Sequence, residues 1–205
     1  MTVIVVANPK GGVGKSTLAT QVAGYLARRG HSVLLGDADR QQSSSRWLAL
    51  RPQQARPIQT WDASHGDSLK PPPGCTHVVL DTPAGLHGRE LKEVLKRADK
   101  LLIPLQPSVF DIMATQDFVA ELQERRRSAG LPIGVVGMRV DPRTLSAEKL
   151  RGFVEALELP VLAYLRDTQH YLHLAAQGLT LFDVTPGRVQ RDLEQWLPIC
   201  RWLER

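Results

Sequence analysis

A glycine-rich loop from Ala7 to Thr17 holds the residues whose types and spacing best suit a chemical task. Glycines in such a loop let backbone N–H groups converge on phosphate oxygens, because no Cβ stands in the way. Lys15 would bridge the β- and γ-phosphates of a nucleoside triphosphate, and the Ser16 hydroxyl would ligate Mg²⁺. Lys10 adds a second cation at the loop entrance. The residues that we expect to hold the nucleotide are Lys10, Gly11, Gly12, Val13, Gly14, Lys15, Ser16 and Thr17.

Two acidic motifs would complete this site. The apolar run 32–36 ends in Asp37-Ala38-Asp39, and the run 77–80 ends in Asp81. Strand side chains alternate between faces, so Asp37 and Asp39 should point the same way. The carboxyl ends of parallel strands form the ligand crevice of an open α/β sheet, so both acids would face the glycine loop. Asp81 suits a carboxylate that holds a Mg²⁺-bound water.

The elements that must position these residues alternate along the chain. Apolar and β-branched runs predict strands at 3–6, 32–36, 58–61, 77–80, 100–105, 133–137 and 161–164. Amphipathic patterns predict helices at 16–29, 43–50, 88–97, 111–128, 146–157, 167–177 and 187–203, the last broken or bent at Pro198. This alternation indicates an α/β fold with a doubly wound, mostly parallel sheet and helices on both faces.

Composition limits the class of protein. A chain of 205 residues suits one domain, 1–205, and shows no repeat or low-complexity linker. No basic and apolar leader precedes the first strand, and no apolar run approaches the length of a membrane helix, so we expect a cytoplasmic protein. Cys75 and Cys200 are too few for a disulfide framework. The net charge of +5 favours a polyanionic partner without demanding one.

Motifs along nearly the whole chain carry a family resemblance. They are Lys10-Gly-Gly-Val-Gly-Lys15-Ser-Thr, Asp37-Ala-Asp39 followed by Gln41, Val79-Leu80-Asp81-Thr82-Pro83, Pro104-Leu-Gln-Pro-Ser-Val-Phe-Asp111, and Ala175-Ala176-x-Gly178 with Phe182-Asp183. Together they resemble the deviant Walker A, P-loop ATPases of the ParA and MinD group. The resemblance is closest to small ParA-type partition or positioning ATPases, which have no N-terminal helix-turn-helix domain.

The resemblance implies roles for individual residues. Lys10 would reach across a dimer interface to the partner's ATP, so that Lys10, Lys15 and Asp39 form the catalytic set. Asp39 would orient the attacking water, and Asp81 would be the Walker B acid. The residues then expected around Mg²⁺ are Ser16, Asp39 and Asp81. The motif at 138–141, Met-Arg-Val-Asp, lacks the Asn-Lys-x-Asp guanine reader, which favours ATP over GTP.

The same resemblance implies a cellular task. ATP would close a sandwich homodimer that binds double-stranded DNA non-specifically over the nucleoid, and a small adaptor protein would stimulate its slow hydrolysis. Such cycling positions a plasmid, a chromosome region or a protein organelle such as a carboxysome. Arg166 and Arg188 are the DNA-contact candidates, because each lies at a helix-start turn in the region that resembles the family's DNA-contacting part.

Two alternatives remain open. A MinD-like membrane-associated regulator would use an apolar stripe in the last helix, formed by Val189, Leu193, Trp196, Leu197, Cys200 and Leu203. We favour packing of this stripe on the sheet, since the fold needs a closing helix, and expect no stable membrane binding. A metabolic enzyme on the same scaffold is the second alternative, but the amidases of that group carry an added catalytic domain for which this chain has no room.

Overall fold

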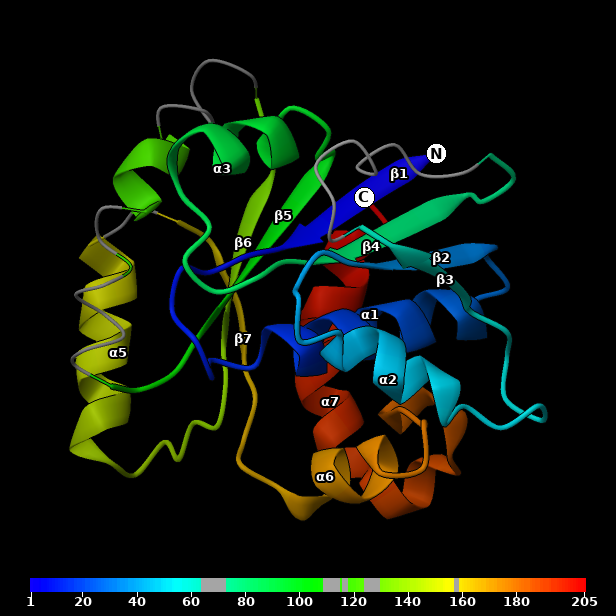
Figure 1. Ribbon diagram of the computed structural model, residues 1–205. Coiled ribbons are helices and arrows are strands. Elements are labelled where there is room, and N and C mark those ends of the chain that lie inside the picture. The colour runs from blue at the N-terminus through cyan, green and yellow to red at the C-terminus, as the bar shows by residue number, and fades with distance from the viewer. Residues whose placement is uncertain (64–72, 109–114, 116–117, 124–129, 157–158) are drawn as a thin grey trace.

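The computed structural model describes residues 1–63, 73–108, 115, 118–123, 130–156 and 159–205 (Figure 1). Its centre is a seven-stranded sheet in the order β3-β2-β4-β1-β5-β6-β7, with every pair parallel. The strands are β1 (Thr2–Val6), β2 (Val33–Asp37), β3 (Gln59–Asp62), β4 (His77–Asp81), β5 (Lys100–Leu105), β6 (Ile133–Gly137) and β7 (Val161–Tyr164). The predicted doubly wound parallel fold is therefore confirmed.

Helices cover both faces of the sheet. They are α1 (Lys15–Arg28), α2 (Ser43–Ala49), α3 (Gly88–Leu95), α5 (Leu145–Ala156), α6 (Gln169–Ala175), the short 3-10 helix η2 (Leu181–Asp183) and α7 (Pro186–Leu203). The helix predicted at 111–128 lies partly outside the described residues, although Thr115 and residues 118–123 are helical. Each of the other predicted helices is present, with bounds that differ by a few residues.

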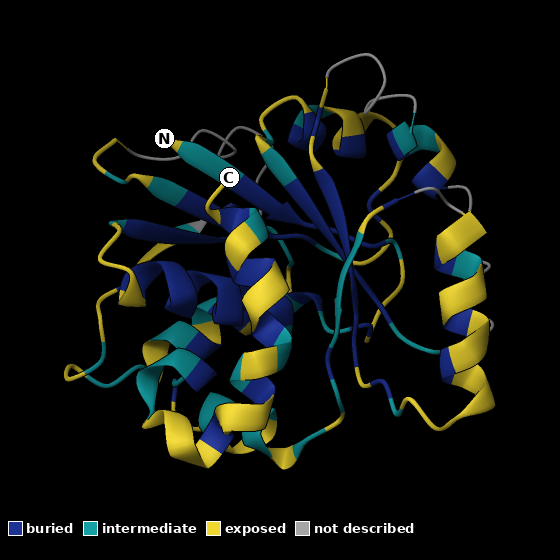
Figure 2. Ribbon diagram, turned by 180° about the vertical axis from the view of Figure 1, so that it is seen from behind, coloured by how far each residue is buried: buried dark blue, intermediate teal, exposed yellow. Residues whose placement is uncertain are grey.

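Alternation along the strands produces two cores. Ile4 and Val6 of β1 pack with α1, α2 and α7, whereas Val5 packs on the opposite face with α3 and α5. Figure 2 shows the central strands buried between these two helical layers, whereas the edge strand β7 is only partly buried. The central strands are apolar on both faces, so polar side chains that could bind a ligand are found at the carboxyl ends of the strands.

The last helix differs from the sequence prediction in one respect. The break predicted at Pro198 is absent, since α7 continues through this residue, and the non-helical backbone lies instead at Val189 (φ −129°, ψ 19°). Pro198 lies on the exposed face of the helix. A proline removes one backbone N–H there, and carbonyls on a solvent-facing side can bond to water, so the helix does not have to end.

The apolar stripe of α7 packs on the sheet. Val189, Trp196, Cys200 and Leu203 are buried in the core that α7 shares with α1, while Leu197 is 49% exposed. This is the packing that we favoured over a membrane anchor. In the part of the chain that the structure describes, no helix combines the length and apolar character needed to cross a membrane.

Candidate nucleotide-binding site

The glycine loop joins the end of β1 to the start of α1 in the conformation that its glycines permit. Gly12 and Gly14 have φ of 78° and 98°, in the left-handed region that favours glycine. A Cβ on Gly14 would lie 3.0 Å from Met138 Cε, so a side chain there meets both strain and crowding. No side-chain hydrogen bond caps the start of α1, which leaves its first N–H groups available to a phosphate.

Polar side chains from other elements hold this loop in place. The buried Asn8 donates from Nδ2 to the Pro104 carbonyl at 2.9 Å and accepts the Lys10 N–H at 2.8 Å. Gln106 donates from Nε2 to the Gly12 carbonyl at 2.9 Å. The loop is thus fixed to the end of β5 from two sides. Asn8 and Gln106 both fall in stretches that the sequence analysis quoted, but their contacts with the loop were not predicted, because neither residue has a spacing that signals its partner.

Lys15 lies inside the loop and Lys10 lies at its edge. The Lys15 side chain folds back so that Nζ donates to the Lys10 carbonyl at 2.8 Å, and the residue is only 8% exposed. Burial lowers the pKa of Lys15, while the charges of Asp81 and Asp39 oppose that effect. Lys10 itself is exposed. The two lysines therefore occupy different environments, as separate roles would require.

Asp81 is a buried carboxylate with one oxygen unpaired. The sheet register places Asp81 beside Val6 of β1 and Asp37 of β2. Its Oδ2 accepts the Ser44 hydroxyl at 2.5 Å, and its Oδ1 has no hydrogen-bond partner in the structure as described. Burial raises the pKa of Asp81 to about 6, against the lowering effects of the Ser44 and Ser16 hydroxyls.

Asp37, which ends β2, and Asp39, two residues further on, have different environments. Asp37 is buried, and its oxygens accept the N–H groups of Asp39 and Ser45, each at 3.0 Å. Burial raises its pKa, and these backbone bonds oppose the rise. Asp37 thus anchors the backbone that follows β2, a role that its spacing did not indicate. Asp39 is half-buried, accepts the Gln41 N–H at 2.9 Å and is close enough to influence Lys15.

The donor set suits a hard divalent cation. An unpaired buried carboxylate oxygen is unfavourable unless a partner reaches it. Asp81 Oδ1 is such an atom, and the Ser16 hydroxyl lies near the same carboxylate. Oxygen ligands of this kind are those that Mg²⁺ prefers, together with substrate phosphates and water. The predicted magnesium residues Ser16 and Asp81 are therefore brought together, with Asp39 at the neighbouring strand end.

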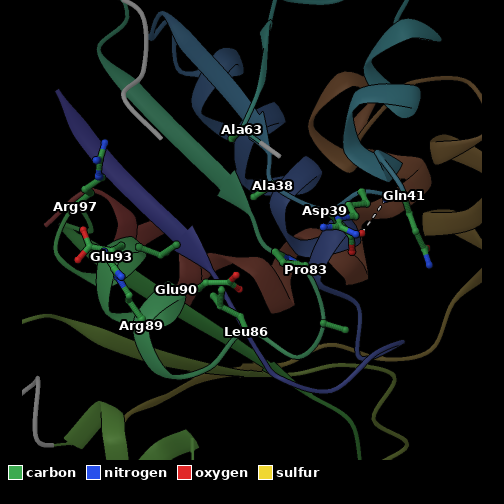
Figure 3. Close-up of a pocket in the computed structure, with 13 residues that line it drawn as sticks. Ala38, Asp39, Gln41, Ala63, Pro83, Leu86, Arg89, Glu90, Glu93 and Arg97 are labelled. Atoms are coloured by element: carbon green, nitrogen blue, oxygen red, sulfur yellow. Dashed lines mark hydrogen bonds between the residues drawn. The ribbon is translucent and has the colours of Figure 1, made fainter. Parts of the chain in front are cut away.

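Two cavities lie at this end of the sheet. One, of about 320 Å³, lies beside Gly14 and Thr17 and is lined by Met138 and by residues after β7, including Leu165 and Arg166. The other, of about 630 Å³, lies between the loops after β2 and β4 and helix α3. Figure 3 shows Asp39 at one side of this larger cavity, with the side chains of α3 along the other.

The two candidate DNA-contact arginines differ in their partners. Arg166 donates from Nε to Asp192 Oδ1 at 2.6 Å and from Nη2 to Asp192 Oδ2 at 3.2 Å. Asp192 is fully buried and also binds His170 Nδ1 at 2.6 Å. Arg188 is exposed in the first turn of α7. Among the described residues, Arg166 is therefore paired with a buried acid, whereas Arg188 lies exposed on the surface.

A strand, a glycine loop, a helix and a buried acid on the neighbouring strand define a P-loop nucleotide-binding protein. Residues 4–181 match the model of the CobQ/CobB/MinD/ParA nucleotide binding domain, and the chain belongs to that family. This confirms the resemblance to ParA-type ATPases.

Three similar proteins illustrate the relationship. The chain is 35% identical over 201 residues to the Maintenance of carboxysome distribution protein A of Gloeobacter kilaueensis, covering 94% of this chain and 88% of the relative. The protein of the same name from Halothiobacillus neapolitanus is 27% identical over 197 residues, covering 92% and 91%. The solved MinD cell division protein of Aquifex aeolicus shares the fold, with a TM-score of 0.76 at 18% identity over 100% and 97% of the two chains.

Proposed function

We propose that this chain is a ParA-type positioning ATPase that binds ATP with Mg²⁺, dimerises on it, and hydrolyses it slowly until an adaptor accelerates the step. The observation that carries the proposal is the unpaired buried oxygen of Asp81, placed beside Ser16 and Lys15 at the end of the glycine loop. A merely structural turn would have no reason to keep such an oxygen without a partner.

The chain's own residues supply most of the binding. Backbone N–H groups of the loop and of the first turn of α1 surround the phosphates, and Lys15 contacts their β- and γ-oxygens. Ser16 and Asp81 would hold Mg²⁺, which would neutralise charge that develops on the phosphates. Asp39 orients the attacking water from a loop whose backbone Asp37 fixes. The cavity beside Gly14 and Thr17 has the position and size to accept the base.

Dimerisation would give the exposed Lys10 a role of its own. Lys10 and Lys15 lie close together in one loop, and two cations on the same phosphate would repel one another unless each had its own anion. The Lys15 side chain turns into its own loop, whereas Lys10 is exposed. We therefore assign Lys10 to the nucleotide of a partner subunit, across a sandwich interface.

We infer the cellular role from the relatives named for carboxysome distribution. In this proposal the ATP-bound dimer holds nucleoid DNA without sequence preference, in the cytoplasm, and an adaptor on the cargo releases it by stimulating hydrolysis. The chain's charge of +5 and the exposed Arg188 support a polyanionic partner.

Nucleotide measurements test the ATPase part. Lys15→Ala should abolish ATP binding, because Lys15 contacts phosphates in the ground state. Asp39→Ala should bind ATP but release little phosphate, because Asp39 acts on the water. Equal loss of binding in both variants would remove the assigned role of Asp39. In light scattering, Asp39→Ala with ATP should be a dimer, and a dimer that survives the additional change Lys10→Ala would refute the trans role of Lys10.

A salt series tests the DNA part. Gel shifts with Asp39→Ala and ATP should show binding whose affinity falls by roughly 0.9 log units per log unit of salt for each phosphate neutralised. Arg188→Ala should lower both affinity and salt slope, whereas Arg143→Ala, at another exposed helix-start turn, should change neither. Binding that is independent of ATP or of salt would contradict the DNA proposal.

A further inference from the structure

The first turn of α2 reaches into the nucleotide site through a serine that the motifs do not single out. Ser44 is fully buried, and its hydroxyl donates to Asp81 Oδ2 at 2.5 Å across 37 positions of sequence. The next residue, Ser45, donates its N–H to Asp37 Oδ2 at 3.0 Å. Two adjacent residues of one helical turn are thus fastened to the carboxyl ends of two neighbouring strands, β4 and β2.

These bonds determine how Asp81 presents its second oxygen. A carboxylate held at one oxygen loses most of its freedom to rotate about the bond that carries it. With Oδ2 bound by Ser44, Oδ1 is the oxygen left without a partner among the described residues. The Ser44 bond therefore selects which oxygen of Asp81 remains available and fixes the direction in which it points.

We propose that Ser44 is a positioning residue for the metal: its hydroxyl holds Asp81 Oδ2 so that Oδ1 faces the magnesium shell, and α2 thereby sets the affinity for Mg²⁺. This inference rests on the proposed ATPase function, since it assigns a role at that same site. Partners that orient a metal-binding group from the second shell commonly change metal affinity by about 10- to 100-fold when removed. The hydroxyl of Ser44 has the position of such a partner.

The test separates metal binding from nucleotide binding. We expect Ser44→Ala to bind ATP in EDTA with wild-type affinity, and to require about 10- to 100-fold more Mg²⁺ at the midpoint of a magnesium titration monitored by ATP affinity. Ser43→Ala is the matched control, because Ser43 is an exposed neighbour in the same turn, and its magnesium midpoint should equal that of the wild type.

A second pair of variants removes the effect of side-chain shape. Ser44→Thr keeps the hydroxyl and Ser44→Val replaces it with a methyl group of similar size, so a higher magnesium midpoint in Val than in Thr reports the hydroxyl alone. Melting temperatures verify that the variants fold. Equal weakening of ATP binding with and without Mg²⁺ would show a packing role and overturn the proposal, as would midpoints that do not differ between Thr and Val. Failure of the wild-type chain to bind ATP would instead refute the proposed function.

Discussion

Arg51, just beyond α2, should be a major determinant of stability. Its side chain is 5% exposed and that of Asp183 is 4% exposed. The guanidinium donates to both Asp183 oxygens, at 3.0 and 2.8 Å, to the Gly178 carbonyl at 3.1 Å and to the Arg56 carbonyl at 2.9 Å. One cation thus ties the end of α2 to the segment that carries η2.

Arg51→Met keeps the aliphatic stem and removes the cation. Breaking a buried ion pair from one side costs about 3 to 5 kcal/mol, because the remaining charge is left buried without its partner. Asp183 retains the Thr180 N–H at 2.8 Å and hydroxyl at 2.7 Å, which places the expected loss near the lower end, at about 3 kcal/mol. For a domain of this size that corresponds to a fall in melting temperature of about 6 to 12 °C.

Urea unfolding of the wild type and two variants would measure this loss. Arg143→Met is the matched control, because Arg143 makes a similar forked contact with Asp141 at 3.0 and 2.8 Å but is 86% exposed. Surface pairs of this kind contribute little, so the control should unfold like the wild type. The reasoning fails if Arg51→Met loses less than about 1 kcal/mol or no more than the control.

Three further predictions concern single positions. Gly14→Ala should weaken ATP binding by about tenfold or more in calorimetry, because its φ of 98° and the nearby Met138 oppose a Cβ, whereas Gly152→Ala in the open interior of α5 should not. Gly178→Ala should lower the free energy of unfolding by about 3 kcal/mol, since its Cβ would lie 2.4 Å from backbone at the end of α2; a change below about 1 kcal/mol would contradict this. Burial, then the charges of His31 and the N-terminal amine, lower the pKa of His77 below 6.5. As the pH falls below 6.5, His77 is therefore protonated in the unfolded chain before it is protonated in the folded one, and the free energy of unfolding decreases. Unfolding measured at several pH values should show a shallower decrease of this free energy for His77→Gln than for the wild type. An identical pH dependence in the two proteins would refute the assignment.

The sequence was sufficient for the features that depend on neighbouring residues. A phosphate loop needs its glycines, lysine and serine in one continuous stretch, so residues 10–17 could be predicted as such a loop from the sequence alone. The alternation of apolar strands and amphipathic helices predicted the parallel fold, because each element must bury one side against the next. Asp81 was predicted for the same reason, since it directly follows an apolar strand.

Only the tertiary structure decided which distant side chains meet. Ser44 falls within the predicted helix 43–50 and had no assigned contact, yet β2 and β4 pair side by side and bring its helix against Asp81. Arg166 was interpreted as a DNA contact, yet α7 places the buried Asp192 against its guanidinium. Periodicity along a chain tells which face of an element is buried but not which element covers it, because strand order and helix packing arise from contacts between segments far apart in sequence.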